Sequence, residues 1–220
     1  MVIERSTYKD QVIQFIYREI LKGNMKPGQQ IKESKLSERL GISRAPIREA
    51  LKELISMGIV EYKPRIGTFV MDPSPEEILQ AYEARGVLEG YAAAKAMDEL
   101  DPEQVAELYN MCEEMKDLAK NRENLKLIDL GDKFHEKIIK PCKNDQIMNF
   151  SYMLSLKSHL MFSKYWAQLY TPEEIENRHR LIVDAIVKHN PEEVERVIRS
   201  HYMETGEKIS HLKKGRSVRK

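Results

Sequence analysis

The sequence predicts a mainly α-helical protein with two parts: a small N-terminal domain of three helices and a β-hairpin, then an all-helical bundle of about six helices. Three observations predict this class. Apolar residues recur at helical spacing through residues 7–57, two short strand-like runs follow, and from residue 75 onward helix patterns succeed one another. The 220 residues are enough for each part to have its own core.

The composition is that of a globular protein, with 41% hydrophobic and 32% charged residues. No apolar run approaches the ~20 residues that a membrane-spanning helix needs, and the N-terminal sequence is unlike a secretory signal. Cys112 and Cys142 have neither zinc-binding nor redox spacing and are expected to be reduced thiols. We therefore expect a cytoplasmic protein without a membrane partner.

The first domain is organised around the stretch Leu36–Leu51, LSERLGISRAPIREAL, which predicts two short helices joined by a tight turn. An amphipathic helix over Thr7–Lys22 precedes it. Ser43 is the expected N-cap of the second of the two helices, and Pro46 lies in its first turn, where proline is tolerated. One face of that helix is apolar and is expected to be buried. Its residues are Ile47, Ala50, Leu51 and Leu54.

A different face of the same helix is cationic, because Arg44, Arg48 and Lys52 recur at i, i+4 and i+8. On a helix considered alone, such a ladder is usually a solvated face. Here two strand-like runs, IVEYK and TFVM, follow on either side of the loop PRIG, which completes a winged helix-turn-helix. In that setting the ladder suits a DNA major groove.

The charge distribution agrees with this interpretation. Residues 1–72 carry 13 Lys/Arg against 9 Asp/Glu, whereas the remainder carries 23 against 26. Only the first domain is therefore expected to bind a polyanion.

A short linker, residues 73–76, separates the winged domain (residues 1–72) from an all-helical domain over residues 77–210. Helix-start signals recur there, as in TPEE at Thr171 and NPEE at Asn190. The basic tail, residues 211–220, is expected to be disordered, with a contact to the DNA backbone as the alternative. The expected helices cover residues 75–98, 101–121, 123–140, 144–169, 171–189 and 191–210.

The N-terminal motifs resemble one bacterial family. The stretch KPGQQI, the segment LGISRAPIREAL and the wing PRIGTFV are similar to the DNA-binding domain of GntR-family transcription regulators, over roughly residues 7–71. The resemblance implies a homodimer on a near-palindromic DNA operator. It implies DNA contacts from Arg44 and Arg48 and from the wing tip at Arg65 and Gly67. Two serines at the starts of helices are placed to contact DNA phosphates through their hydroxyl groups and the helix-end N–H groups. These are Ser34 and Ser43.

The helical domain contains three histidines whose spacing is informative. His179 lies eleven residues before Asn190 and His201 eleven residues after it, so in an antiparallel helix pair their imidazoles should lie at the same height. On another helix, Asp132 and His135 stand at i and i+3, on one face. An aspartate with three histidines can coordinate a divalent transition metal such as Zn, Ni or Mn. Each histidine taken singly is more often an ordinary surface or core residue.

The segments EARGVLEGYAAAKA, DKFHEKIIKPCKN, NRHRLIVDAI and VIRSHYMETG resemble the FCD effector-binding domain of FadR-type GntR regulators. The resemblance implies a metal held by an Asp and three His, with a carboxylate effector beside it, and transfers onto His135, His179 and His201. The family acid stands four residues before the first His, where this chain has Gly131, so Asp132 points about 100° away. A three-His site completed by water or effector, or a site without metal, remains open.

Arg85 is the position at which the resemblance places an arginine that binds the effector carboxylate. The alternative is an i, i+4 pair with Glu89 on the solvent side. The leading hypothesis is thus a transcription regulator, a repressor in its commoner form, whose operator binding responds to a small organic acid. A regulator that senses the metal itself and, less favoured, a metalloenzyme are the alternatives.

Overall fold

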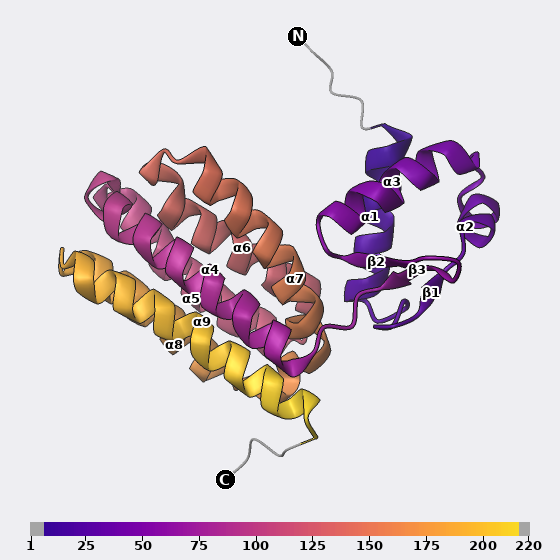
Figure 1. Ribbon diagram of the computed structural model, residues 1–220. Coiled ribbons are helices and arrows are strands. Elements are labelled where there is room, and N and C mark those ends of the chain that lie inside the picture. The colour runs from indigo at the N-terminus through magenta and orange to yellow at the C-terminus, as the bar shows by residue number, and fades with distance from the viewer. Residues whose placement is uncertain (1–6, 216–220) are drawn as a thin grey trace. The chain divides into compact units, whose positions relative to one another are not determined.

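The computed structural model describes residues 7–215, apart from the side chain at position 167. The chain divides into two compact units, Met1–Asp72 and Pro73–Lys220, which Figure 1 shows as a small mixed unit and a helical bundle. The predicted fold class is confirmed: a winged helix-turn-helix is followed by an all-α bundle.

The N-terminal unit contains three helices and three short strands. Its helices pack on a common core in which Ile16, Ile47, Leu54 and Ile59 are almost completely inaccessible to solvent. Packing of these apolar stripes supplies most of the stability of helices this short. In chain order the elements are α1 (Tyr8–Leu21), β1 (Gln30–Ile31), α2 (Glu33–Leu40), α3 (Arg44–Ser56), β2 (Val60–Lys63) and β3 (Gly67–Val70).

The sheet has one strand more than the predicted hairpin. The strand order is β1-β3-β2, and β3 pairs antiparallel with both neighbours. The sequence could not reveal β1, because a strand of two residues is too short to show alternation. Gln30 of β1 donates through Nε2 to the carbonyl of Ile66 at 2.8 Å and so ties the new strand to the wing.

The C-terminal unit consists of six α-helices and two 3₁₀ turns within the described residues. The predicted capping box at Thr171 forms, two further capping boxes form at Ser74 and Asp101, and Asn190 caps the last helix. In chain order the elements are α4 (Pro75–Ala96), η1 (Met97–Glu99), α5 (Pro102–Lys120), α6 (Asn124–Ile139), η2 (Lys140–Cys142), α7 (Asp145–Leu169), α8 (Pro172–Val187) and α9 (Pro191–Lys213).

Helices α4 and α9 form the closest pair of the bundle and run side by side in Figure 1. Glycines allow this approach. A Cβ added at Gly86 would lie 3.3 Å from the Cα of Arg199, and one added at Gly206 would lie 2.7 Å from the Cβ of Tyr82. Because interiors are close-packed, larger residues here would push the helices apart.

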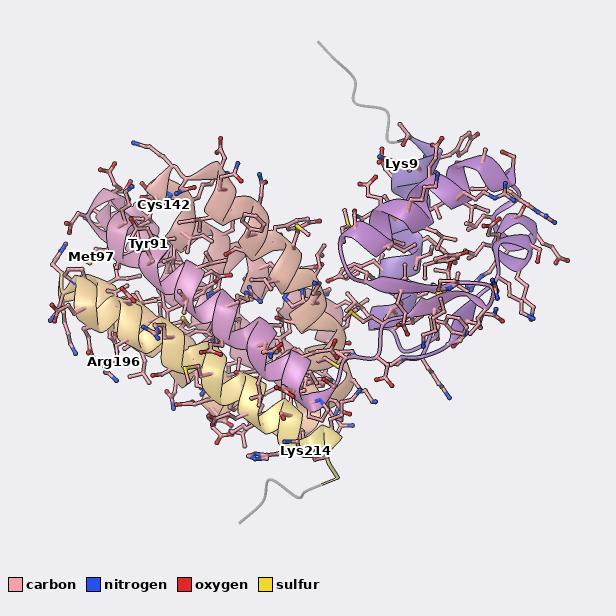
Figure 2. All side chains as sticks on the ribbon, in the orientation of Figure 1. Lys9, Tyr91, Met97, Cys142, Arg196 and Lys214 are labelled. Atoms are coloured by element: carbon pink, nitrogen blue, oxygen red, sulfur yellow. The ribbon has the colours of Figure 1, made fainter. Side chains whose placement is uncertain are left out.

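The predicted boundary of the tail is wrong by a few residues. α9 continues to Lys213, so residues 211–213 are helical, and residues 216–220 lie outside the described part of the chain. Basic side chains in the last turn, His211 and Lys213, complement the carbonyl end of the helix. Across residues 7–215, no helix combines the length and apolar character that crossing a membrane requires. Cys112 and Cys142 are free thiols, as predicted, and both are buried (Figure 2 labels Cys142).

Candidate functional site

Helix α3 presents two faces, as its sequence pattern predicts. The apolar stripe is buried, and Ser43 occupies the N-cap position with extended backbone (φ −65°, ψ 163°). The Ser43 side chain makes no capping hydrogen bond and is exposed. Its hydroxyl group is therefore accessible to a ligand from solvent.

The cationic ladder lies on the exposed side of α3. Arg44, Arg48 and Lys52 are all exposed. Arg48 has a protein partner: its Nε donates a hydrogen bond to Oε2 of Glu33 on α2 at 2.8 Å. An ion pair this exposed stabilises the fold by less than about 1 kcal/mol, so a phosphate or base can compete for the guanidinium.

The remaining predicted DNA-facing residues come from the start of α2 and from the wing. Ser34 is exposed in the first turn of α2. Arg65 is exposed in the turn between β2 and β3 and has a positive φ of 64°. Gly67 has a φ of 128°, and a Cβ there would lie 2.8 Å from Nε2 of Gln30, so this turn favours glycine at position 67.

In the bundle, the structure brings His135 of α6, His179 of α8 and His201 of α9 together. Their ring centroids are separated by 5.6 Å (His135–His179), 5.1 Å (His135–His201) and 4.8 Å (His179–His201). One ring nitrogen of each lies within 4.8 Å of those of the other two. The equal offsets from Asn190 thus predicted the meeting of His179 and His201 correctly. We call this group the three-histidine cluster.

The electrostatics of the cluster suit metal ligation. Burial lowers the pKa of His179 to about 4 and lowers the pKa values of His135 and His201 well below their usual range, so the imidazoles are neutral. Nδ1 of His179 donates to the carbonyl of Ile175 at 2.7 Å, which leaves Nε2 with its lone pair. Nδ1 of His201 is buried without a hydrogen-bond partner among residues 7–215. Neutral, oriented rings with an unsatisfied nitrogen are what a transition metal requires.

Asp132, the expected fourth ligand, is not brought into the cluster. Its Oδ1 lies 3.0 Å from Nε2 of His159 on α7 and 3.7 Å from Nη2 of Arg85. Burial opposes ionisation of Asp132, but His159 and Arg85 outweigh burial and lower its pKa. The prediction of Asp132 as a ligand is therefore corrected. At one residue beyond Gly131, the side chain is rotated by about 100° and pairs with α7.

Arg85 is buried, so the interpretation of an Arg85–Glu89 pair on the solvent side is wrong, although the pair itself exists. Nε of Arg85 donates to Oε1 of Glu89 at 2.7 Å, and the guanidinium carbon lies 4.6 Å from the ring centroid of Tyr202. Burial alone would lower the pKa of Arg85, but Glu89, Tyr202 and Asp132 raise it, so the side chain remains a cation.

A cavity of about 90 Å³ adjoins the three-histidine cluster and Arg85, and residues from α4 to α9 line it. Gly131 also lines it, and a Cβ at that position would meet no atom within 4 Å. The space beside the cluster is thus left to a small ligand.

Sequence reasoning assigned no role at the site to two residues near this cavity. Glu89 accepts from the hydroxyl of Tyr202 and approaches Nδ1 of His135 at 3.6 Å, so it can orient that imidazole. His159 of α7 contacts Asp132 through Nε2. The i, i+4 spacing from Arg85 was the available signal for Glu89, whereas nothing local in the sequence pointed to His159.

Two family models match the chain. Residues 8–70 match "Bacterial regulatory proteins, gntR family", and residues 80–204 match "FCD domain". The chain belongs to the GntR family and carries an FCD domain. GntR-family regulators bind DNA operators, so the winged unit is the DNA-binding domain of a transcriptional regulator.

Relatives agree with this assignment. The Bacillus subtilis (strain 168) protein "Uncharacterized HTH-type transcriptional regulator YdhC" is 28% identical over 88% of this chain and 87% of its own. The "Probable D-xylose utilization operon transcriptional repressor" of Paenarthrobacter nicotinovorans is 26% identical over 90% and 87%. These families and relatives are transcriptional regulators, and the metalloenzyme alternative is set aside.

A solved structure, "E. coli McbR/YncC", superimposes on the chain with a TM-score of 0.77 at 21% sequence identity. It covers 97% of this chain and is itself covered over 100% of its length. At this identity the likeness concerns the fold alone, and it extends through both units.

Proposed function

We propose that this GntR-family regulator is a homodimeric repressor that binds a near-palindromic operator and responds to a small organic acid. The acid binds beside a divalent transition metal (Zn, Ni or Mn) held by His135, His179 and His201. The observation that carries the proposal is the three-histidine cluster, with its nitrogens within 4.8 Å of one another beside a cavity. A metal bound there would supply a Lewis acid for an anionic oxygen.

The residues around the cluster would have separate roles in binding. Ile175 fixes the ring of His179 through its carbonyl, and Glu89 lies beside Nδ1 of His135. Arg85 contributes a positive charge to the cavity and is held in place by Glu89. A carboxylate in the cavity would therefore meet a cation on α4 and the cluster on α6, α8 and α9.

In the DNA-binding unit, Arg44 and Arg48 are the residues we propose for the major groove. Both are exposed on α3, and a guanidinium can donate two hydrogen bonds to guanine O6 and N7. Arg65 at the wing tip and the hydroxyls of Ser34 and Ser43 are proposed to contact the sugar–phosphate backbone.

Metal analysis and operator binding together test the proposal. We expect one transition-metal ion per chain in the purified protein, lost in His179→Ala and retained in His189→Ala. His189 is a matched control because it is exposed and paired with Asp98, away from the cluster. Absence of stoichiometric metal from the wild-type protein would remove the metal from the proposal.

Operator affinity, measured by gel shift on DNA from upstream of the gene, separates the remaining possibilities. Affinity that changes when small organic acids are added to the metal-loaded protein supports an acid-responsive regulator. Affinity that changes when EDTA and then Zn or Ni are added, and is indifferent to acids, favours the metal-sensing alternative. A folded dimer that forms no complex at low salt would contradict the DNA-binding role assigned to α3.

A further inference from the structure

The lining of the cavity beside the three-histidine cluster is polar in one part and apolar in the rest. Its polar part contains the cluster itself, the cation of Arg85 and the Asp132–His159 pair. The rest is largely aliphatic or aromatic, and four of these residues are less than 6% exposed. The apolar lining residues are Met115, Leu127, Ile128, Phe162 and Ile175.

The hydroxyl groups that also line the cavity are already committed to protein acceptors. Tyr82 donates to the carbonyl of Ser158 at 3.2 Å, and the Ser158 hydroxyl donates to the carbonyl of Leu154 at 2.8 Å. Thr205 donates to the carbonyl of His201 at 2.9 Å. A ligand hydroxyl would have to displace one of these bonds to gain a donor.

Arg178, the second arginine of the lining, is likewise occupied. Its guanidinium donates to Glu204, to the carbonyl of His201 at 2.6 Å and to the hydroxyl of Thr205 at 3.2 Å. It joins α8 to α9. In Arg85, Nε donates to Glu89, whereas Nη2 lies 3.7 Å from the Asp132 carboxylate, beyond hydrogen-bond distance. Only one end of the cavity therefore offers charge to an anion.

The size of the cavity limits a ligand that lies wholly within it. An apolar cavity of about 150 Å³ in another protein holds benzene, and the cavity here measures about 90 Å³. A ligand that lies wholly within it is therefore smaller than benzene, although Arg85, Asp132 and His135 also line an adjoining pocket of about 330 Å³. A chain of about three or four carbons ending in a carboxylate is of this order.

We infer that the effector is a short aliphatic monocarboxylate without hydroxyl groups on its body, such as isobutyrate in size and chemistry. Its carboxylate faces Arg85 and the three-histidine cluster, and its methyl groups contact Ile128 and its apolar neighbours. This inference rests on the proposed function and adds the class of acid. A sugar acid or a tricarboxylate would leave buried polar groups without partners in the apolar part.

Calorimetric titration of the Zn-loaded wild-type dimer with four acids tests the inference. Isobutyrate is expected to bind most tightly. Its matched analogue 3-hydroxyisobutyrate, which differs by one hydroxyl group on the body, is expected to bind on the order of 10-fold more weakly. Gluconate and citrate are expected to bind more weakly still. An Ile128→Thr variant, which places a hydroxyl group in the apolar part, should narrow the difference between the first two acids.

Each result of these titrations either supports or overturns the inference. Equal binding of isobutyrate and its hydroxylated analogue, or tighter binding of gluconate or citrate, overturns the inference and leaves an acid-responsive regulator standing. Failure of all four acids to bind overturns the inference and counts against the proposed acid response as well. If Ile128→Thr does not fold, as its urea midpoint would reveal, the four wild-type titrations still decide.

Discussion

Two arginine–glutamate pairs, one in each unit, have nearly the same geometry and very different surroundings. Arg48 lies 2.8 Å from Glu33 in the DNA-binding unit, and Arg85 lies 2.7 Å from Glu89 in the bundle. The side chains of the first pair are 60% and 36% exposed, and those of the second are 6% and 2% exposed. Water screens the first pair and is excluded from the second.

The difference in exposure decides what each arginine can do. Arg48 can exchange its glutamate for a DNA phosphate or base at little cost, because an exposed pair contributes little to stability. Arg85 cannot leave Glu89 without creating a buried uncompensated charge, so its position is fixed before any ligand arrives. The same pair of residue types therefore gives an adaptable contact on the surface and a preorganised charge in the cavity.

Removing one carboxylate from each pair gives the sharpest contrast. Glu89→Gln is expected to lower the free energy of unfolding by about 3–5 kcal/mol, because the buried Arg85 loses its closest carboxylate and keeps only the more distant Asp132. Glu33→Gln is expected to lower it by less than about 1 kcal/mol. Urea unfolding followed by circular dichroism measures both. Similar small losses in the two variants would break the comparison.

Operator binding should depend on exposed arginines of α3 and not on the cavity. Arg44→Ala is expected to weaken binding about 5- to 150-fold if its guanidinium reads a guanine. Anisotropy titrations of a labelled duplex at several salt concentrations measure this, and metal content should not change. The control is Lys52→Ala, two turns farther along α3, where at most a phosphate contact is expected. A larger loss in Lys52→Ala than in Arg44→Ala would reverse the assignment.

The smallest expected effect is a gain. Glu33→Gln releases Arg48 and removes a negative charge close to the DNA-facing helix, so operator affinity should rise, by about 5-fold at most. Glu38→Gln removes an equal charge from another exposed position of α2 and serves as the matched control. A gain of the same size in both variants would mean that net charge matters and that the Arg48–Glu33 pair does not compete with DNA.

Much of the fold and part of the candidate site could be predicted from the sequence, for identifiable reasons. The winged unit could be predicted because its signals are local: the stripe from Ile47 to Leu54 and the turn at Gly41 need no distant partner. His179 and His201 could be placed together because they lie on consecutive helices joined by a short turn. There the constant rise per residue fixes relative height.

What could not be predicted depends on contacts between distant segments. Asp132 turns toward His159, 27 positions farther along the chain and on another helix, and no local pattern reveals that pair. The burial of Arg85 is decided by α9, which approaches α4 closely because Gly86 and Gly206 lack side chains. Periodicity places Arg85 on a face of α4 but does not say which helix covers that face.

The close packing of α4 against α9 also constrains how a signal could leave the cavity. With Gly206 in contact with Tyr82 and Gly86 against the backbone of Arg199, the two helices cannot slide along each other without steric overlap. If the proposed ligand engages Arg85 on α4 or His201 on α9, the two helices would therefore move together. Helix α4, the first of the two, begins at Pro75, three residues after the DNA-binding unit ends at Asp72.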